Sequence, residues 1–398
     1  MIAFSRAAAA ALLACAVALP ATTLPAHAAT PAAPAASLRA AAPAVPALEL
    51  PAPTGRFAVG SSVLHLVDRS RPDPWVPTAD GRELMVTMHY PAARGTQGPP
   101  APYVSEEVAR TVLSGVGVTD PASVKAVAGM TAYSSLDVRP APGRHPLVVL
   151  SPGFGMPRFT LTSLATELAS RGYAVASVDH AYEASAIVVP DGRMLGCVAC
   201  EALEAGRIKG ADVTAARAAD VRFLLDRLTG PRAAATWPYA RTIDQSRVGM
   251  AGHSIGGAAA EAAMLADRRV DAGVNMDGSF WDKLPAGGLG GRPFLMLGTD
   301  DEMHRPGGVD KSWDTTWRAL DGWKRWLTVS GADHFTFTDA PVIQQHFGLP
   351  AGDIPADRAL AVTRAYVTAF FDRQLRGLPQ PLLAGPSPLH PEVHFQQP

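Results

Sequence analysis

Short apolar runs alternate with longer amphipathic segments through the chain from residue 146 onward. The runs expected to form buried strands are Pro146–Leu150, Ala174–Val178, Val248–Ala251, Ala272–Met276, Phe294–Leu297 and Trp326–Val329. The segments with helical spacing are Leu161–Arg171, Val213–Leu228 and Arg358–Arg376, and a Trp-rich helix is expected before the last strand. Because strands separated by helices pair in parallel, this pattern predicts an α/β doubly wound fold, with a mostly parallel central sheet and helices on both faces.

The remaining segments follow a different pattern. Val59–Val67 and Leu84–Tyr90 predict two strands that pair antiparallel at one edge of the sheet. Residues 91–143 are rich in Gly and Pro, contain one short predicted helix at Glu106–Leu113, and are expected to line the substrate cleft. Residues 181–212 interrupt the strand–helix alternation with a hairpin signal and predict a small lid-like insertion.

The amino terminus has the features of an export signal. Arg6 precedes an apolar run over residues 7–19, and Ala26-His27-Ala28 fits the small-x-small cleavage pattern. The run is too short to span a bilayer, so no stable membrane anchor is expected. The sequence therefore predicts a secreted protein whose signal peptide, residues 1–28, is cut after Ala28.

The domain boundaries follow from composition. Residues 29–54 are rich in Ala and Pro with little charge, which is typical of a poorly ordered linker. Residues 55–398 are interpreted as one domain that ends in a Pro-rich tail over residues 378–398.

Removal of the signal peptide leaves Cys197 and Cys200 as the cysteines of the mature chain. In an oxidising compartment an isolated C-x-x-C pair favours a local disulfide. A zinc site would need further His or Cys ligands, and no nearby motif supplies them, so no metal is expected.

Composition excludes some partners. The 398 residues carry 35 basic and 36 acidic side chains, for a net charge of −1, without long runs of either sign. No nucleic-acid partner is therefore expected. The 47% of hydrophobic residues can fill a sizeable core, and the oligomeric state stays open.

The chemistry centres on Gly252-His253-Ser254-Ile255-Gly256-Gly257, a G-x-S-x-G motif. The motif lies between an apolar strand and the helix-forming run Ala258–Leu265, the context that a nucleophile elbow requires. The glycines allow a sharp turn and a close approach of strand and helix. Ser254 is the predicted nucleophile, although a Gly-rich turn without chemistry has the same local pattern.

A serine nucleophile needs a base, and the base needs an acid that orients it. His334 is the histidine after Ser254 that directly follows an apolar strand, where ligands bind in such sheets, and it is the predicted general base. Two places fit the acid: Asp277, which ends one strand, and the Asp300-Asp301-Glu302 cluster, which follows the next. Chain order alone does not choose between them.

An oxyanion hole requires two backbone N–H groups directed at the developing charge. Ile255, directly after the nucleophile, is expected to supply one. Phe154, in the Gly153-Phe154-Gly155 loop after the strand Pro146–Leu150, is expected to supply the other.

Several motifs together carry a family resemblance. They are Leu150–Gly155, Val178-Asp179-His180, Ala184-Ser185-Ala186, Pro190–Arg193, Gly252–Gly257, Asn275–Gly278 and Gly331–Phe335. In this order and spacing, the chain over about residues 56–376 resembles the platelet-activating-factor acetylhydrolase family, plasma and intracellular type II, within the α/β-hydrolase superfamily.

The resemblance implies several properties. The family's acid follows the strand after the elbow helix, at the position matched by Asp277, with Asp301 and Glu302 as fallbacks. It implies a calcium-independent hydrolase that acts on short or oxidised acyl chains at the glycerol sn-2 position. We therefore expect a secreted serine esterase without cofactor, acting through an acyl-enzyme on short-acyl esters or phospholipid-like acetyl esters.

The chain also resembles bacterial secreted lipases and cutinase-type polyester hydrolases, through its Ser-Pro-Gly-Phe loop and its elbow. In those enzymes the acid lies after the later strand, where Gly298–Glu302 stands. Exposed aromatic residues around Trp281 and Phe335 would favour this alternative. A catalytically silent binding protein on the same fold is a further alternative.

Overall fold

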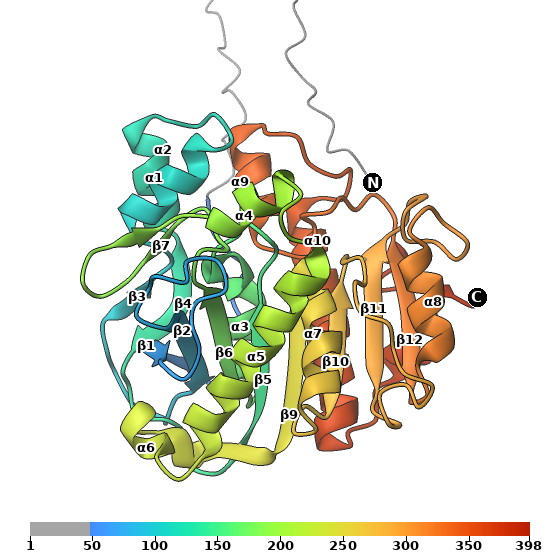
Figure 1. Cartoon of the computed structure of the whole chain (residues 1–398), viewed down its shortest axis with the longest axis horizontal. Coiled ribbons are helices and arrows are strands. Elements are labelled where there is room, and N and C mark those ends of the chain that lie inside the picture. Colours follow the sequence, from blue (N-terminus) through green and yellow to red (C-terminus); the bar gives the residue numbers. More distant parts are fainter. Residues whose placement is uncertain (1–47) are drawn as a thin grey trace, which may run out of the picture. The chain divides into compact units, whose positions relative to one another are not determined.

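A computed structural model describes residues 48–398 of the chain (Figure 1). The predicted signal peptide, its cleavage site and most of the predicted linker lie outside the described residues. Residues before the predicted domain boundary near residue 55 already pack against the domain. Leu50 is buried, and Thr54 donates its backbone N–H to Glu167 over 2.8 Å.

Within residues 48–398 one sheet of eleven strands organises the fold, in the order β13-β12-β11-β10-β9-β5-β6-β2-β1-β4-β3. The strands are β1 (Val59–Asp68), β2 (Arg82–Pro91), β3 (Pro100–Pro102), β4 (Thr131–Leu136), β5 (His145–Ser151), β6 (Ala174–His180), β9 (Ile243–His253), β10 (Ala272–Met276), β11 (Phe294–Thr299), β12 (Lys324–Val329) and β13 (Val393–Gln396). The six strands β6, β5, β9, β10, β11 and β12 pair in parallel, as the alternating pattern predicts. Strands β1 and β2 pair antiparallel, and β2 joins β6.

The helices cover both faces of this sheet (Figure 1). They are α1 (Glu106–Ser114), α2 (Pro121–Ala128), α3 (Thr162–Ser170), α4 (Val198–Glu204), α5 (Gly210–Thr229), α6 (Ala233–Thr236), α7 (Ile255–Ala266), α8 (Lys311–Ala319), α9 (Ala340–Phe347) and α10 (Ala356–Arg376). Three single-turn helices are η1 (Arg158–Leu161), η2 (Ala240–Thr242) and η3 (Pro381–Leu383). A short hairpin of β7 (Ile187–Val188) and β8 (Met194–Leu195) forms part of the 181–212 insertion.

Strand β5 shows why the central strands are apolar throughout. Leu147 and Val149 join the core cluster formed with α5 and α7, whereas Val148 and Leu150 join the cluster formed with α3 and α10. Successive side chains of a strand point to opposite faces of the sheet. Because both faces are covered here, apolar residues do not alternate with polar ones along the strand. The carboxyl ends of these parallel strands then share one edge, where a site can form.

Some elements were not predicted. Strands β3 and β4 and helix α2 lie in the segment interpreted as mixed chain, and strand β13 lies in the predicted tail. The Pro-rich tail is the largest difference, because Val393–Gln396 adds to the sheet edge as an antiparallel neighbour of β12. Edge strands are short and tolerate flanking prolines, so their local pattern is weak. None of the helices in the described part of the chain is long and apolar enough to cross a membrane.

Candidate active site

Ser254 lies at the sharp turn between β9 and α7. Its backbone has φ 55° and ψ −127°, a conformation that residues other than glycine rarely adopt. Its N–H donates to the Met276 carbonyl over 2.7 Å. Such strain persists where the surroundings enforce it, and it is found mainly at functional sites. The turn directs a partly exposed serine to the carboxyl edge of the sheet.

The motif glycines are required by close backbone approaches. A Cβ at Gly252 would collide with the backbone of Gly256, and a Cβ at Gly256 would collide with the Ser151 carbonyl. A Cβ at Gly257 would collide with the side chain of Asn275. The sequence pattern that predicts the elbow therefore has a direct steric cause in the packing of β5, β9 and α7.

His334 and Asp277 meet next to this turn. His334 follows β12, Asp277 follows β10 at φ 60°, and the imidazole Nδ1 donates to Asp277 Oδ2 over 2.7 Å. The carboxylate is buried, whereas the His334 side chain is 45% exposed. Burial alone would raise the pKa of Asp277, but the hydrogen bond from His334 and the charges of His304 and His334 hold it below its ordinary value.

His253, within the elbow motif, fixes the backbone of His334. Its Nε2–H donates to the His334 carbonyl over 2.6 Å, and the two rings lie 4.7 Å apart. Burial, together with the charge of His334, lowers the pKa of His253 to about 3, so this ring is neutral. The motif histidine therefore has a structural contact to His334 that the sequence does not reveal.

A further histidine lies behind the acid. His304 is buried, with Nδ1 2.8 Å from Thr299 Oγ1 and 3.3 Å from Asp277 Oδ1. The Thr299 N–H also donates to Asp277 Oδ1 over 2.7 Å. Both oxygens of Asp277 are thus engaged. No local pattern in the sequence indicates this contact of His304.

The alternative acids lie elsewhere. Asp300 is bound by Arg305, with an Nε–Oδ1 distance of 2.8 Å, and also accepts from Thr328. Asp301 is exposed, and its carboxylate lies 3.5 Å from His304. Glu302 is exposed as well. The structure brings Asp277 to His334 and none of these three.

The two predicted oxyanion donors lie at the required edge. Phe154 follows β5 and Ile255 begins α7, and neither backbone N–H donates a hydrogen bond to any other group within residues 48–398. The Phe154 loop is held from both sides of that residue. Gly155 N–H donates to the Glu183 carbonyl over 2.9 Å, and Arg217 Nη1 donates to the Pro152 carbonyl over 2.5 Å.

A buried charge cluster lies under this loop. Arg82 is fully buried and contacts Asp73, Glu183 and Asp220, with the contact to Asp220 Oδ2 at 2.8 Å. Arg217 is also buried and donates from Nε to Glu183 Oε2 over 2.7 Å. Burial would raise the pKa of Glu183 and Asp220, but the neighbouring arginines hold both below their ordinary values.

The cluster also contains a second serine–histidine–aspartate arrangement. His180 Nδ1 lies 2.7 Å from Asp220 Oδ2, and its Nε2 lies 3.0 Å from Ser151 Oγ. The sequence predicted neither this arrangement nor the charge cluster, because their members come from β2, β5, β6, α5 and the loops that hold Asp73 and Glu183.

The 181–212 insertion lies against the same loop. Cys197 and Cys200 are joined by a disulfide at the start of α4, and Cys200 Sγ would lie 3.8 Å from a Cβ at Gly155. No group of three or more His, Cys, Asp or Glu side chains in the described chain is arranged to hold a metal ion.

Two large aromatic side chains are exposed near the candidate triad. Phe335 is 40% exposed, and its ring lies 5.6 Å from that of His334. Trp281, four residues after Asp277, is 49% exposed and packs against the backbone of Gly210 at the start of α5. The Phe335 ring offers apolar contact area beside His334.

Comparisons with known proteins find esterases and acetylhydrolases. The family model for platelet-activating factor acetylhydrolase, isoform II, matches residues 121–190. A probable 1-alkyl-2-acetylglycerophosphocholine esterase of Arthroderma benhamiae is 29% identical over 375 residues, covering 86% of this chain and 92% of that protein. The structure of a ferulic acid esterase from Streptomyces cinnamoneus superimposes with a TM-score of 0.78 at 47% identity, covering 88% of this chain and all of the other.

The fold, the site and these relatives define a carboxylic ester hydrolase with the α/β-hydrolase fold. The catalytically silent binding protein considered from the sequence is therefore not retained. The chain belongs to the same α/β-hydrolase family as this ferulic acid esterase, and it is similar to the platelet-activating-factor acetylhydrolases.

Proposed function

We propose that the protein is a serine esterase in which Ser254, His334 and Asp277 act as the catalytic triad. The observation that supports this most is the 2.7 Å hydrogen bond from an exposed His334 to a buried Asp277, beside a serine held in a strained turn. A buried carboxylate keeps the imidazole in one tautomer and stabilises the imidazolium that forms during the reaction.

The proposed reaction has two steps. Ser254 Oγ attacks the ester carbonyl carbon while His334 Nε2 takes the hydroxyl proton, and the N–H groups of Phe154 and Ile255 stabilise the oxyanion. The bond to the leaving alcohol breaks as His334 returns the proton to its oxygen. Water, deprotonated by His334, then attacks the acyl-enzyme, and the acid is released as Ser254 recovers its proton.

We propose short-acyl esters or phospholipid-like acetyl esters as substrates. The support is the family match and the Arthroderma relative, whose description names an acetyl ester of glycerophosphocholine. The export signal predicted from the sequence supports a secreted enzyme that meets its ester outside the cell. The disulfide between Cys197 and Cys200 is consistent with an oxidising compartment.

A second candidate is an esterase of bulkier substrates, such as aromatic esters or the lipids and polyesters cleaved by lipases and cutinase-like enzymes. The exposed rings of Trp281 and Phe335 favour it, since an aromatic surface beside the nucleophile adds contact area for a large acyl or alcohol group. The Streptomyces relative is described as acting on a ferulic acid ester, which has an aromatic acyl group.

The experiment that separates these candidates is hydrolysis of p-nitrophenyl esters from acetate to palmitate, with methyl ferulate alongside. Activity confined to short chains favours the acetylhydrolase-like function, and a peak at longer chains favours a lipase. Fast cleavage of methyl ferulate that falls in Trp281→Ala, with acetate hydrolysis unchanged, favours the aromatic substrate. Activity that survives Ser254→Ala would contradict the proposed triad.

A further inference from the structure

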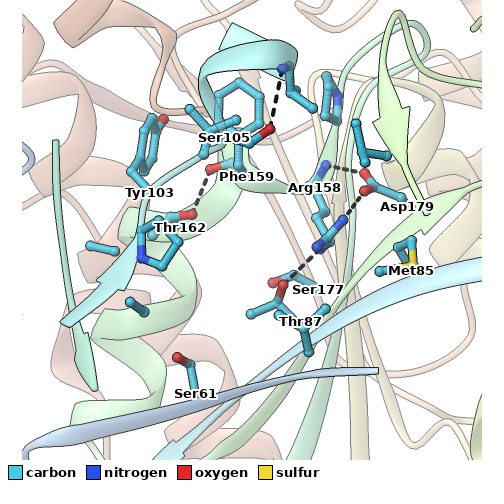
Figure 2. Close-up of a pocket in the computed structure, with 18 of the residues that line it drawn as sticks. Ser61, Met85, Thr87, Tyr103, Ser105, Arg158, Phe159, Thr162, Ser177 and Asp179 are labelled. Carbon is cyan, nitrogen blue, oxygen red and sulfur yellow. Dashed lines mark hydrogen bonds and ion pairs between the residues drawn. The ribbon is translucent and has the colours of Figure 1, made fainter. Parts of the chain in front are cut away.

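A cavity of about 410 Å³ lies on the α3 face of the sheet, away from the candidate triad. Its floor consists of side chains from β1, β2, β4 and β6, and its roof comes from η1, α1 and β7 (Figure 2). Ser254, Asp277, His334, Phe154 and Ile255 are not among the residues that line it. The volume is within the range of small-molecule sites, about 300–1,000 Å³.

The walls are mainly apolar, and one end reaches solvent. Met85, Val108 and Phe159 are buried wall residues. Val63, on the outward end of the floor, is 51% exposed. The 91–143 segment, expected from the sequence at the substrate cleft, lines this separate cavity in the structure through α1, β3 and β4.

Two buried polar groups on the floor have no hydrogen-bond partner in the described chain. They are Ser177 Oγ and His89 Nδ1, from side chains only 2% and 4% exposed. Ser177 lies opposite Thr87 in the β2–β6 pairing, and Figure 2 shows these two side chains together below the cavity. A buried polar group without a partner is costly, so a ligand that completes its hydrogen bonds is favoured there.

The cavity carries no net charge. Arg158 and Asp179 form an ion pair in its wall, and Arg158 Nε also donates to Thr87 over 2.7 Å (Figure 2). Burial, reinforced by the charge of Arg158, lowers the pKa of His89 to about 4, so its ring is neutral near pH 7. Tyr103, whose hydroxyl donates to Asp339 over 3.2 Å, is neutral as well, because burial raises its pKa well above the ordinary value.

We propose that this cavity is a second ligand site that binds a small neutral molecule with an apolar body and one hydroxyl group, an alcohol or a phenol. The hydroxyl of the ligand bonds with Ser177 Oγ and His89 Nδ1, and its body contacts Met85, Val108 and Phe159. A hydroxyl fits because it can donate to one group and accept from the other. A charged ligand is disfavoured because the buried ion pair leaves no unbalanced charge for it.

The cavity does not include the residues proposed for catalysis, but some of its lining residues are close in sequence to the Phe154 loop. Pro157, Arg158 and Phe159 line the cavity and follow the Phe154 loop directly. The proposal concerns binding alone, and it holds whether or not Ser254 is the nucleophile.

The test is isothermal titration calorimetry of the full chain with phenylethanol, and with phenylacetate as the charged comparison. We expect saturable binding of phenylethanol with one site per chain, and at least tenfold weaker binding of phenylacetate. Ser177→Ala is expected to weaken phenylethanol binding about two- to tenfold through loss of one hydrogen bond. Ala186→Leu, which fills the cavity from a fully buried wall position, is expected to abolish it.

Ser163→Ala is the matched control. Ser163 is also a buried serine whose hydroxyl has no partner among the described residues, but it does not line the cavity, so its loss is expected to leave binding unchanged. Urea unfolding of each variant reports folding independently of the ligand. Absence of phenylethanol binding to the wild type, equal binding by Ser177→Ala and wild type, or preference for phenylacetate would each overturn the proposal.

Discussion

Two serine–histidine–aspartate arrangements lie at the carboxyl edge of the same sheet. In one, His334 Nδ1 lies 2.7 Å from Asp277; in the other, His180 Nδ1 lies 2.7 Å from Asp220 and Nε2 lies 3.0 Å from Ser151. Their histidine–aspartate distances are the same. We call the first the outer relay and the second the inner relay.

The relays differ in access and in spare hydrogen-bonding capacity. The His334 side chain is 45% exposed, whereas the His180 side chain is 1% exposed. In the inner relay Ser151 Oγ also accepts from Arg217 Nη1 over 3.0 Å, so its hydroxyl is fully engaged.

The backbone differs as well. Ser254 stands in a strained turn with positive φ, whereas Ser151 is the last residue of a regular strand. A serine, a histidine and an aspartate in hydrogen-bonding order therefore do not by themselves identify a nucleophile. A nucleophile also needs access to substrate and N–H donors that are not already used.

The largest expected difference between the relays comes from removing each serine. Ser254→Ala is expected to reduce kcat for p-nitrophenyl acetate by on the order of 10⁵-fold or more, since no other group can form the acyl-enzyme. Ser151→Ala is the matched control and is expected to keep activity within about tenfold of the wild type, in line with an oxyanion loop that has lost one of its supports. A comparable collapse in both variants would remove the distinction between the relays.

Replacement of the aspartate of the outer relay is expected to have the next largest effect on activity. Asp277→Asn is expected to lower kcat by about 10⁴-fold, because an amide can hold His334 in the wrong tautomer. The measurement is steady-state kinetics, with circular dichroism to establish folding. Asp301→Asn serves as the control, because Asp301 is exposed and contacts His304. Loss of activity in Asp301→Asn with retention in Asp277→Asn would assign the acid to the later cluster.

The inner relay is expected to matter most for stability. Asp220→Asn removes one of the three carboxylates that pair with the buried Arg82 and one of the two that pair with Arg71. Breaking a buried pair costs about 3–5 kcal/mol of unfolding free energy. Urea unfolding measures this, and Asp80→Asn, at an exposed pair with Arg69, is expected to leave the midpoint almost unchanged. Equal stability of Asp220→Asn and wild type would show that the cluster is dispensable.

The smallest expected effect is the pH dependence of that stability. The folded-state pKa of Asp220 and Glu183 lies below the ordinary value, so their stabilisation is present above the unfolded pKa and is lost as pH falls through the folded one. Wild-type unfolding free energy is therefore expected to fall below about pH 4, at up to ~1.4 kcal/mol per pH unit for each group. Asp220→Asn is expected to show a shallower slope over the same pH range in urea unfolding, and an unchanged slope would contradict this assignment.

Local sequence signals predicted the core of the fold. The strand–helix alternation predicted the parallel strands β5, β6, β9, β10, β11 and β12, because a buried strand or an amphipathic helix leaves its pattern within about ten residues. The G-x-S-x-G motif predicted the turn at Ser254 for the same reason, since the steric need for glycine is local. The position of His334 directly after a strand also followed from local pattern.

The tertiary structure decided what depends on which strands are neighbours. The choice between Asp277 and the Asp301 cluster could not be made from chain order, because it requires the contact between the ends of β10 and β12. Arg82 and Asp220 are 138 residues apart and meet only after β2 and α5 have packed. Strand β13 and the cavity above Ser177 likewise arise from distant segments. Side-chain periodicity is a property of one segment, whereas charge pairing and cavities are properties of several segments brought together, and only the folded chain determines them.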